Sequence, residues 1–544
     1  MTFFRKYSFN LYVFLFFFAA ERIPSADFRH FAALLASFRK LKECKIQPRL
    51  RSPPIFPNNF FFWKNTTRMQ LSASLTKNLA PIKRELQSDD VSFTEFTVYG
   101  KKAVLIFVND ITDKKSAGEL ILKPLSEAKT EFNEDFVKNE IPAPEKKTVR
   151  TTEDAVEEVV SGNVLLIADG TDKAFSFGLK KFEKRAISEP PTSTVLKGPR
   201  EGFVESLPVN VSMMRRRLKT PALKFLNLTV GKYSKTPVSI CYLKGIADDA
   251  LVKKLKEKIS AINIDAILDS SYVTKFLGEH KASVFKQVGN TEKPDILAAK
   301  ILEGRVAVFV DGSPIALTVP YLLIEDFQSP SDYYNSVYSA TFARFLRLFA
   351  VSLSVLLPAF FVSAELFHLQ LIPLSFLLTI VNSIKGIPLS PSYEMFFTLM
   401  IFEVLNEASV RMPKYVGMVV SIVGGLVLGE TAVTAGIISA PTLMIVAFSG
   451  ICLYTVPELE QTFSVIRLLY LIVGGSIGAY GLVLLSVGLV IYLVSFETFD
   501  TPLTAPFSPI VRSDLKDGFY KGFLIDQRMR PKSIPHKNDK RTGD

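Results

Sequence analysis

The sequence has few of the residues that build disulfide frameworks and metal centres. Its 544 residues include three cysteines and four histidines. The cysteines (Cys44, Cys241 and Cys452) are scattered, with no CxxC spacing and no nearby pair of histidines. This distribution argues against a disulfide framework and against a zinc site. We therefore expect free thiols, no metal site and no cofactor.

The sequence also lacks a basic folded body. Its net charge is +12, but residues 1–68 carry 12 Lys/Arg and 3 Asp/Glu, which leaves +3 for the remaining 476 residues. A nucleic-acid-binding protein carries its basic excess on a folded domain. Because most of the excess lies in the first 68 residues, we expect no nucleic-acid partner.

Residues 1–68 differ in composition from the rest of the chain. Leu11–Ala20 is an apolar run of ten residues behind Arg5 and Lys6. That pattern is typical of a signal-peptide core and is shorter than the roughly 20 residues of a membrane span. Three interpretations compete: a cleaved signal peptide, a membrane-associating leader, and an upstream extension outside the native fold. We favour the extension, with Met69 as the true start.

Residues 69–334 read as a soluble α/β protein, rich in Lys, Glu and Asp. One pattern within them predicts a helix over 152–160, then Gly162, a strand over 163–168, an Asp-Gly turn and a strand over 174–179. Asp-Gly between two apolar runs is a hairpin signal.

The same pattern returns 142 residues later. It predicts a helix over 296–302, then Gly304, a strand over 305–310, an Asp-Gly turn and a strand over 315–320. This repetition predicts two related α/β lobes. The alternative is that a common helix-plus-hairpin unit occurs twice independently.

The predicted lobes are separated by a charged connector over 188–217. We assign residues 69–214 to the first lobe and connector, and 215–334 to the second lobe. The groove between two such lobes is a natural ligand cleft. The connector is either a solvated loop or an Arg/carboxylate network that docks lobes or subunits. The candidate docking residues are Arg200, Glu201, Glu205, Arg215, Arg216 and Arg217.

Long apolar runs dominate the chain after about residue 345. Together they predict an all-α polytopic transmembrane bundle over 335–500, followed by a tail over 501–544. A repeated Ile-Val-Gly-Gly phrase within them would also suit a transporter. The five runs are 348–364, 369–384, 416–428, 437–456 and 468–496, of which the last has 29 residues without a charge.

One polar helix is predicted between these runs, over 394–413. Glu403, Glu407 and Arg411 are spaced i, i+4, i+8 and therefore share one face, with Asn406 beside them. Ionisable groups at membrane depth usually line water, a pathway or a subunit contact. We predict that these four residues form or border an ion path. The alternative is an amphipathic helix on the membrane surface.

Several motifs in order resemble the A subunits of GerA-type spore germination receptors. The resemblance covers about residues 74–518 and departs from the family pattern at Ser193, Leu399 and Asn406. Its clearest pieces are Gly-Pro-Arg-Glu-Gly-Phe at 198–203 with Glu205, Asn210 and the arginines 215–217, then Lys-Pro-Asp at 293–295, Glu-Gly-Arg-Val-Ala at 303–307, Asp-Gly-Ser-Pro at 311–314 and Asp-Tyr-Tyr at 332–334.

This resemblance implies a nutrient-responsive receptor subunit in the inner membrane of a bacterial spore. It implies B and C subunits as partners, and a homo-oligomer around a cation pathway. No nucleophile–base pair, metal cluster or phosphate loop is evident, so we do not expect an enzyme. A secondary transporter and a non-conducting membrane scaffold remain alternatives. We also expect the soluble domain and the tail to share the cytoplasmic side, which requires an even number of crossings.

Overall fold

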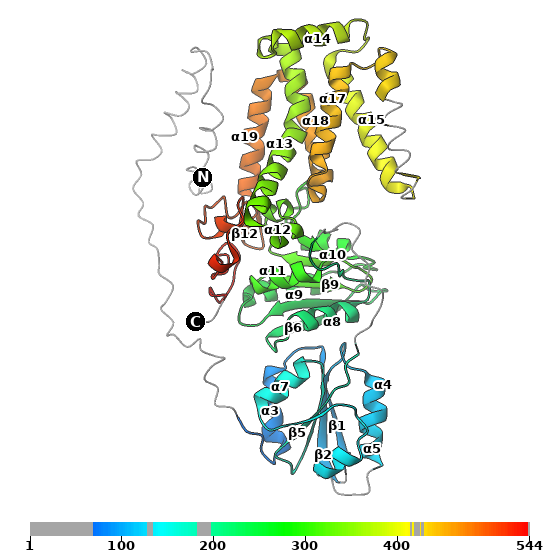
Figure 1. Ribbon diagram of the computed structural model, residues 1–544, viewed down its shortest axis with the longest axis vertical. Helices are drawn as coiled ribbons and strands as arrows, with labels where there is room; N and C mark the ends of the chain where they lie inside the picture. The colour runs from blue at the N-terminus through cyan, green and yellow to red at the C-terminus, as the bar shows by residue number, and fades with distance from the viewer. Residues whose placement is uncertain are drawn as a thin grey trace, which may run out of the picture.

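The computed structural model describes residues 69–98, 100–127, 134–181, 197–413, 416–417, 425 and 429–541. The predicted leader, residues 1–68, lies outside this set. Figure 1 shows an elongated molecule with two α/β lobes at one end and a helical domain at the other. Lobe 1 comprises 69–181, lobe 2 comprises 203–334, and the helical domain comprises 337–495.

Lobe 1 is a five-stranded antiparallel sheet with helices on both faces. α3 (Leu75–Glu85) and α7 (Thr152–Val160) cover one face, while α4 (Lys114–Ala117), α5 (Lys123–Ser126) and α6 (Glu134–Asn139) cover the other. Because both faces are covered, the central strand is apolar throughout and fully buried. In sheet order the strands are β1 (Val91–Val98), β2 (Lys101–Val108), β4 (Val164–Ala168), β5 (Ala174–Phe177) and β3 (Lys146–Val149).

Lobe 2 repeats this topology. Its strand order, β6-β7-β9-β10-β8, is the order of lobe 1 shifted by five strands. Its sheet is also covered on both faces. The strands are β6 (Leu223–Val230), β7 (Thr236–Leu243), β9 (Val306–Val310), β10 (Ala316–Val319) and β8 (Gly289–Thr291), and the helices are α8 (Leu207–Arg217), α9 (Asp249–Ser260), α10 (Ser270–Leu277) and α11 (Pro294–Leu302).

Equivalent polar contacts support the repeat. Asn78 in α3 accepts a hydrogen bond from the Ser72 amide (2.9 Å) and donates to the Ser72 carbonyl (2.6 Å). Asn210 in α8 makes the same two bonds, at the same distances, with Val204. In each Asp-Gly turn, the aspartate carboxylate also accepts a hydrogen bond from the first turn of a helix. Asp169 accepts from the Leu75 amide, and Asp311 accepts from the Leu207 amide, both at 3.0 Å.

The repeat moves one predicted boundary. A boundary at residue 215 falls inside α8, which is the lobe 2 counterpart of α3. Phe203 already belongs to the lobe 2 core and packs edge-on against Phe309, with ring centroids 5.2 Å apart. Lobe 2 therefore begins before α8, and the connector is correspondingly shorter.

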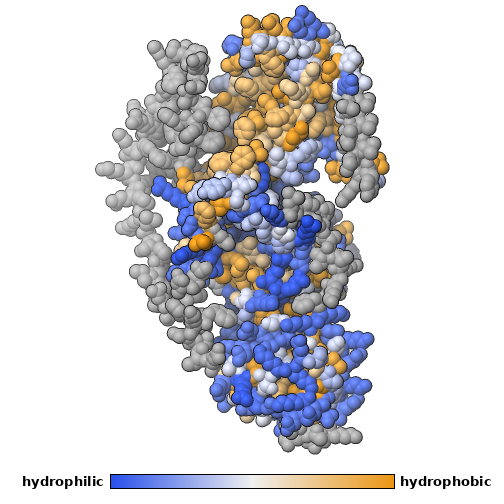
Figure 2. All heavy atoms as spheres, in the orientation of Figure 1, coloured by the Kyte–Doolittle hydropathy of each residue, from blue (hydrophilic) through white to orange (hydrophobic). Residues whose placement is uncertain are grey.

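The helical domain is built around one long helix. α13 (Val337–Phe367) packs against α15, α17, α18 and α19. Its buried face includes Ala350, Ser354 and Ala359, and small residues of this kind let helices approach closely. Figure 2 shows hydrophobic residues over much of the visible face of this domain, with hydrophilic residues at its far tip. The other helices are α14 (Leu374–Ile384), α15 (Pro391–Arg411), α17 (Ala440–Leu453), α18 (Glu460–Ile477) and α19 (Ala479–Ser495).

The predicted apolar runs correspond only partly to spanning helices. Among the described residues, α13 alone is long and apolar enough to cross a membrane; α17 and 457–477 meet the test as a pair bent by 108°. α14 and α19 are shorter apolar helices. Most of the run 416–428 lies outside the described residues. The number of crossings therefore stays a prediction.

The longest apolar run is not one helix. The structure divides 468–496 at Gly478, which lies between the end of α18 and the start of α19. The backbone φ of Gly478 is +76°. The Tyr470 hydroxyl donates to Ser486 at 3.0 Å, so the two helices form an antiparallel hairpin. Gly474 and Gly478, which are four residues apart in the chain, have different roles. Gly474 lets α18 approach Ala359 of α13, and Gly478 turns the chain.

After α19 the chain returns to lobe 2. The segment 497–541, called here the C-terminal segment, begins with β11 (Glu497–Thr498) and β12 (Thr501–Pro502). It ends beside lobe 2, where His536 bridges Ala247 and the Lys537 amide donates to the Ile246 carbonyl at 2.8 Å. Lobe 2 and the C-terminal segment thus lie on the same side of the helical domain.

The repeat supplies a matched pair of glycines for testing this attachment. Gly162 and Gly304 both have positive φ, +92° and +110°. A Cβ on Gly304 would lie 2.7 Å from the His536 Cβ, whereas the nearest atom to a Cβ on Gly162 is 3.6 Å away. Gly162→Ala should cost only backbone strain, about 1–2 kcal/mol. Gly304→Ala should cause the same strain and should also release the C-terminal segment from lobe 2. Trypsin should then cleave that segment faster in Gly304→Ala than in Gly162→Ala. Equal cleavage rates in the two variants would contradict this attachment.

Candidate functional site

The predicted docking residue Arg215 lies between the two lobes. Its guanidinium, at the C-terminal end of α8, makes a bidentate ion pair with Asp90, with Nε–Oδ2 and Nη2–Oδ1 distances both 2.8 Å. Both side chains are buried. Ser88, in the same turn as Asp90, accepts from Arg215 and from the Phe225 amide of β6. The arginine therefore joins lobe 1 to the edge of the lobe 2 sheet.

The other predicted docking residues lie within or beside lobe 2. Glu201 pairs with both Arg216 and Arg217, and its Oε2 lies 2.7 Å from Arg217 Nη2. Glu205 is exposed, and its carbonyl accepts from the Gly312 amide at 2.8 Å. Arg200, in the same loop, is partnered as well. The set thus divides: Arg215 contacts lobe 1, whereas Glu201 fastens the connector to α8.

The same loop meets the chain that leads into the helical domain. Gly198 has a φ of +118°, and a Cβ there would lie 2.6 Å from the ring of Tyr334. The Tyr334 hydroxyl donates to Asp295 at 2.5 Å. Burial and the Asp295 carboxylate raise the pKa of Tyr334 to about 12. Glycine at this position lets the connector lie directly on the tyrosine.

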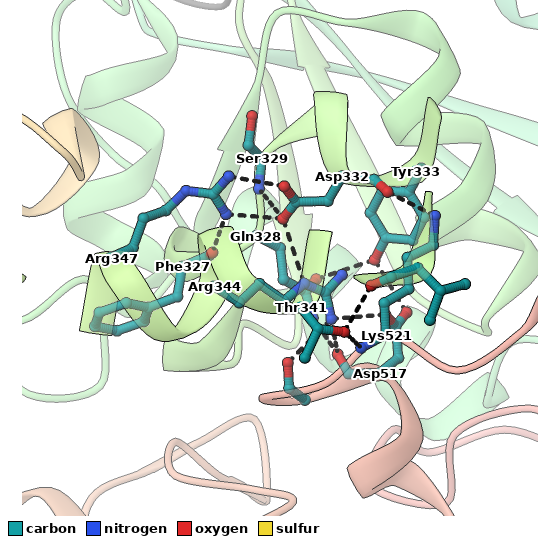
Figure 3. Close-up of polar contacts among 12 residues, drawn as sticks. Phe327, Gln328, Ser329, Asp332, Tyr333, Thr341, Arg344, Arg347, Asp517 and Lys521 are labelled. Atoms are coloured by element: carbon teal, nitrogen blue, oxygen red, sulfur yellow. Dashed lines mark hydrogen bonds and ion pairs between the residues drawn. The ribbon is translucent and has the colours of Figure 1, made fainter. Parts of the chain in front are cut away.

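A polar cluster with a buried centre fastens α13 to lobe 2 (Figure 3). We call it the junction, and it consists of Asp332, Tyr333, Arg344, Arg347, Asp517 and Lys521. Asp332 in α12 (Pro330–Tyr334) receives a bidentate ion pair from Arg347, with both N–O distances 2.7 Å. Arg344 Nε adds a third contact at 3.3 Å. Asp332 and Arg344 are both buried.

The C-terminal segment completes the junction. Arg344 Nη1 donates to the carbonyls of Asp517 and Gly518, each at 3.0 Å, and pairs with the Asp517 carboxylate at 3.0 Å. Lys521 Nζ donates to the Asp332 carbonyl at 2.6 Å, and Tyr333 donates to Asp517 at 3.0 Å. Segments almost two hundred residues apart therefore meet at the Arg344 guanidinium and at the Asp332 backbone carbonyl (Figure 3).

A second contact lies at the base of α18 and α19. Val284 of lobe 2 accepts through its carbonyl from Thr462 at 2.9 Å, and Lys286 pairs with Glu458. Phe285 is buried between Phe463 and Tyr492, with ring centroids 6.3 and 6.2 Å away. Lobe 2 thus contacts three of the bundle helices through two separate sites.

The predicted ion-path residues all lie on α15, in two groups. Glu403 pairs with Arg467 of α18, and Asn406 donates to Glu460 at 2.6 Å. Glu407 and Arg411 form an exposed pair one helical turn apart, with an Nε–Oε1 distance of 2.6 Å. The four residues share a polar side of the helix, and within the described bundle Glu403 and Asn406 make ion-pair or hydrogen-bond contacts with α18.

Sequence reasoning missed the partner of Glu403. Arg467 is buried in α18, and its Nη1 donates to Ser449 of α17 at 3.0 Å. Ser449 in turn donates to the Ser354 carbonyl of α13 at 2.7 Å. The only sequence signal was an arginine at the edge of an apolar run. The carboxylate of Glu403 is therefore compensated by a buried cation, which an account based on α15 alone does not include.

Glu394 has a partner on another helix. Its carboxylate accepts hydrogen bonds from both the amide and the hydroxyl of Ser439 at 2.7 Å and so caps the start of α17. The cap fixes the N-terminal ends of α15 and α17 together.

Comparison with known families shows which protein family this chain belongs to. Residues 80–533 match the family described as Bacillus/Clostridium GerA spore germination protein. The chain belongs to the GerA family. Its match includes both lobes, the junction and most of the C-terminal segment, so all the contacts above fall within the family region apart from those of Ser72, Leu75, Asn78 and the last residues of the chain.

Individual GerA relatives are similar over most of their length. The chain is 33% identical to spore germination protein KA of Bacillus subtilis, over 87% of this chain and 89% of that protein. It is 34% identical to spore germination protein GerQA of Bacillus cereus, over 82% and 90%. The N-terminal domain of the A subunit of the Bacillus megaterium germinant receptor GerK3 is a similar solved structure, 28% identical over 47% of this chain and 99% of that domain, with a TM-score of 0.37.

The junction makes a direct stability prediction for this GerA protein. Asp332→Asn removes the charge that buried Arg344 and partly buried Arg347 share, and removing one partner of a buried ion pair costs about 3–5 kcal/mol. The exposed pair of Asp249 and Lys537 offers a control, because Asp249→Asn should cost at most about 1 kcal/mol. Thermal unfolding of the detergent-purified chain measures both. Similar melting temperatures for the two variants would show that the junction does not stabilise the fold.

The lobe interface makes a pH prediction. Burial and the negative charge of Asp90 raise the pKa of Asp110 to about 6, from an ordinary value of 3.8. The folded state therefore binds the proton more tightly, so the Asp110 contribution favours folding increasingly as the pH falls from about 6 towards 4. Asp110→Asn should remove that trend and stabilise the chain at pH 7 by about 1–3 kcal/mol.

Unfolding curves between pH 4 and 7 test this, with the exposed Asp172→Asn as the matched control. The difference between wild type and Asp110→Asn should change across this range, whereas the control should run parallel to wild type. A parallel Asp110→Asn curve would contradict the assignment.

Proposed function

We propose that this chain is the A subunit of a nutrient germinant receptor in the inner membrane of a bacterial spore. In this proposal the two lobes respond to nutrient, directly or through B and C subunits, and the helical domain responds by releasing ions. The relatives named as spore germination proteins support the germination role. The observation that carries the mechanism is the junction, which connects lobe 2, α13 and the C-terminal segment through buried charge.

The junction suits signal transfer because it is short and stiff. Bidentate arginine–carboxylate pairs fix both distance and orientation. A displacement of lobe 2 therefore moves α13, around which the other helices pack. Phe285 and Lys286 attach the same lobe to α18 and α19. Two attachment sites on different helices would convert a rotation of lobe 2 into a shift between those helices.

We place the ion path along the polar side of α15. Its residues Glu403 and Asn406 face Arg467 and Glu460 of α18. Charged groups buried in lipid would be costly, and water along this side removes most of that cost. Carboxylates there favour cations over anions. In a homo-oligomer, several copies of α15 would surround the path.

The buried partner of Glu403 makes the ion-path proposal testable by charge balance. Glu403→Gln leaves the positive charge of Arg467 uncompensated, so we predict that cation flux through reconstituted receptor falls about tenfold or more. The double variant Glu403→Gln/Arg467→Gln removes both charges and should recover part of the flux. Glu407→Gln, beside exposed Arg411, is the matched control and should change flux less than threefold.

Receptor abundance and assembly with B and C subunits must be measured on the same preparations. Equal flux in all variants would place the path elsewhere. Assembly without flux in the wild type would support a scaffold, and flux that requires stoichiometric substrate uptake would support a transporter.

A further inference from the structure

A cleft lies at the base of α13, beside the junction. It has a volume of about 560 Å³ and is formed between the first turns of α13 and residues 516–526 of the C-terminal segment. Aromatic residues line it, among them Phe342, Phe345, Tyr520 and Phe523, and all four are exposed. Large exposed apolar surfaces of this kind mark sites that bind a partner or a lipid.

The walls of the cleft are held in place. Phe345 stacks on Phe519 at a centroid distance of 6.2 Å, and Phe519 stacks on Phe507 at 4.1 Å. The Lys521 amide donates to Thr341 at 3.2 Å, while its ammonium group donates to the junction. One wall therefore belongs to the same hydrogen-bonded unit as Asp332. A molecule in the cleft would touch the junction directly.

The position along α13 indicates a lipid. The helix has 31 residues and so extends about 46 Å, whereas the hydrocarbon core of a bilayer is about 30 Å thick. Arg344 and Arg347 pair with lobe 2 near one end, and this end therefore lies at the edge of the hydrocarbon, at the level of the lipid headgroups. Aromatic and basic residues concentrate at that interface. The exposed aromatic face continues upward from the cleft through Phe349 and Phe360.

The rim of the cleft carries one charge of each sign. Lys516 and Asp526 both line it and are exposed. Neither makes an ion pair within the described part of the chain. A phosphate group would suit Lys516, and an ammonium group would suit Asp526. A headgroup with both charges therefore complements the rim better than a purely anionic one.

We propose that this cleft binds one phospholipid with an amine headgroup, its acyl chain against Phe342 and Phe523 and its headgroup at Lys516 and Asp526. The inference rests on the proposed function in one respect, the insertion of the helical domain into a membrane.

Native mass spectrometry of the full chain in detergent tests the proposal, with phosphatidylethanolamine and phosphatidylglycerol of identical acyl chains as probes. Wild type should bind one phosphatidylethanolamine about two- to fivefold more tightly than phosphatidylglycerol, as expected for one exposed charge contact. Asp526→Asn should abolish that preference. Lys516→Gln should weaken both lipids.

A second pair of variants tests the apolar part. Phe342→Ala should weaken both lipids about tenfold, whereas Phe360→Ala, exposed on the same helix but outside the cleft, should not. Binding without headgroup preference, unchanged in all four variants, would overturn the proposal. A dimer that excludes lipid would assign the cleft to a second copy and overturn it as well.

Cell fractionation separates the two proposals. A chain that is soluble without detergent would defeat the membrane receptor function and the premise of the lipid site. A chain in the membrane fraction that retains no lipid would defeat the lipid site alone.

Discussion

A single buried carboxylate connects the two halves of this protein. Asp332 receives Arg347 and Arg344 from α13, and its carbonyl receives Lys521 from the C-terminal segment. Two arginines thus meet two carboxylates, because Asp517 pairs with Arg344. Burial makes each of these groups expensive unless all are present. The position of the helical domain relative to lobe 2 therefore depends on this arrangement.

A second buried ion pair joins the two lobes to each other. Arg215 and Asp90 form one buried bidentate pair between lobe 1 and lobe 2. Lys224 beside them is buried, and burial lowers its pKa to about 8. Its ammonium group donates to the Glu85 carbonyl of lobe 1 at 2.6 Å. Lobe 1 is thus connected to lobe 2 by the Arg215–Asp90 pair, and lobe 2 is connected to α13 by the pairs of Asp332.

Local patterns in the sequence predicted much of the fold. The Gly–strand–Asp-Gly–strand phrase at 162–179 and 304–320 predicted both hairpins, because positive-φ glycines and Asp-Gly turns leave a residue-level signature. Spacing also predicted a helix that places Glu407 and Arg411 on one face, and in α15 these two residues form an ion pair. The shared strand order of the two sheets needed the structure, since strand pairing depends on contacts between distant residues.

The parts that sequence reasoning missed are long-range or depend on packing. No sequence pattern near Glu403 predicts that Arg467 is its partner, and none near Asp332 predicts its contact with Lys521. The division of 468–496 at Gly478 had a weak signal, because 29 uncharged residues exceed the roughly 20 that one span needs. A glycine with no preference for negative φ decides where that run turns.

The most direct test of the account is the distance between lobe 2 and the far end of the bundle. Spin labels on cysteines introduced at exposed Lys253 and Ser476, with the native cysteines replaced by alanine, report it by pulsed electron resonance. The account predicts one narrow distance distribution for this labelled chain and a broad one when Asp332 is changed to Asn. A narrow, unshifted distribution in the folded Asp332→Asn protein would contradict the claim that this carboxylate connects the lobes to the helices.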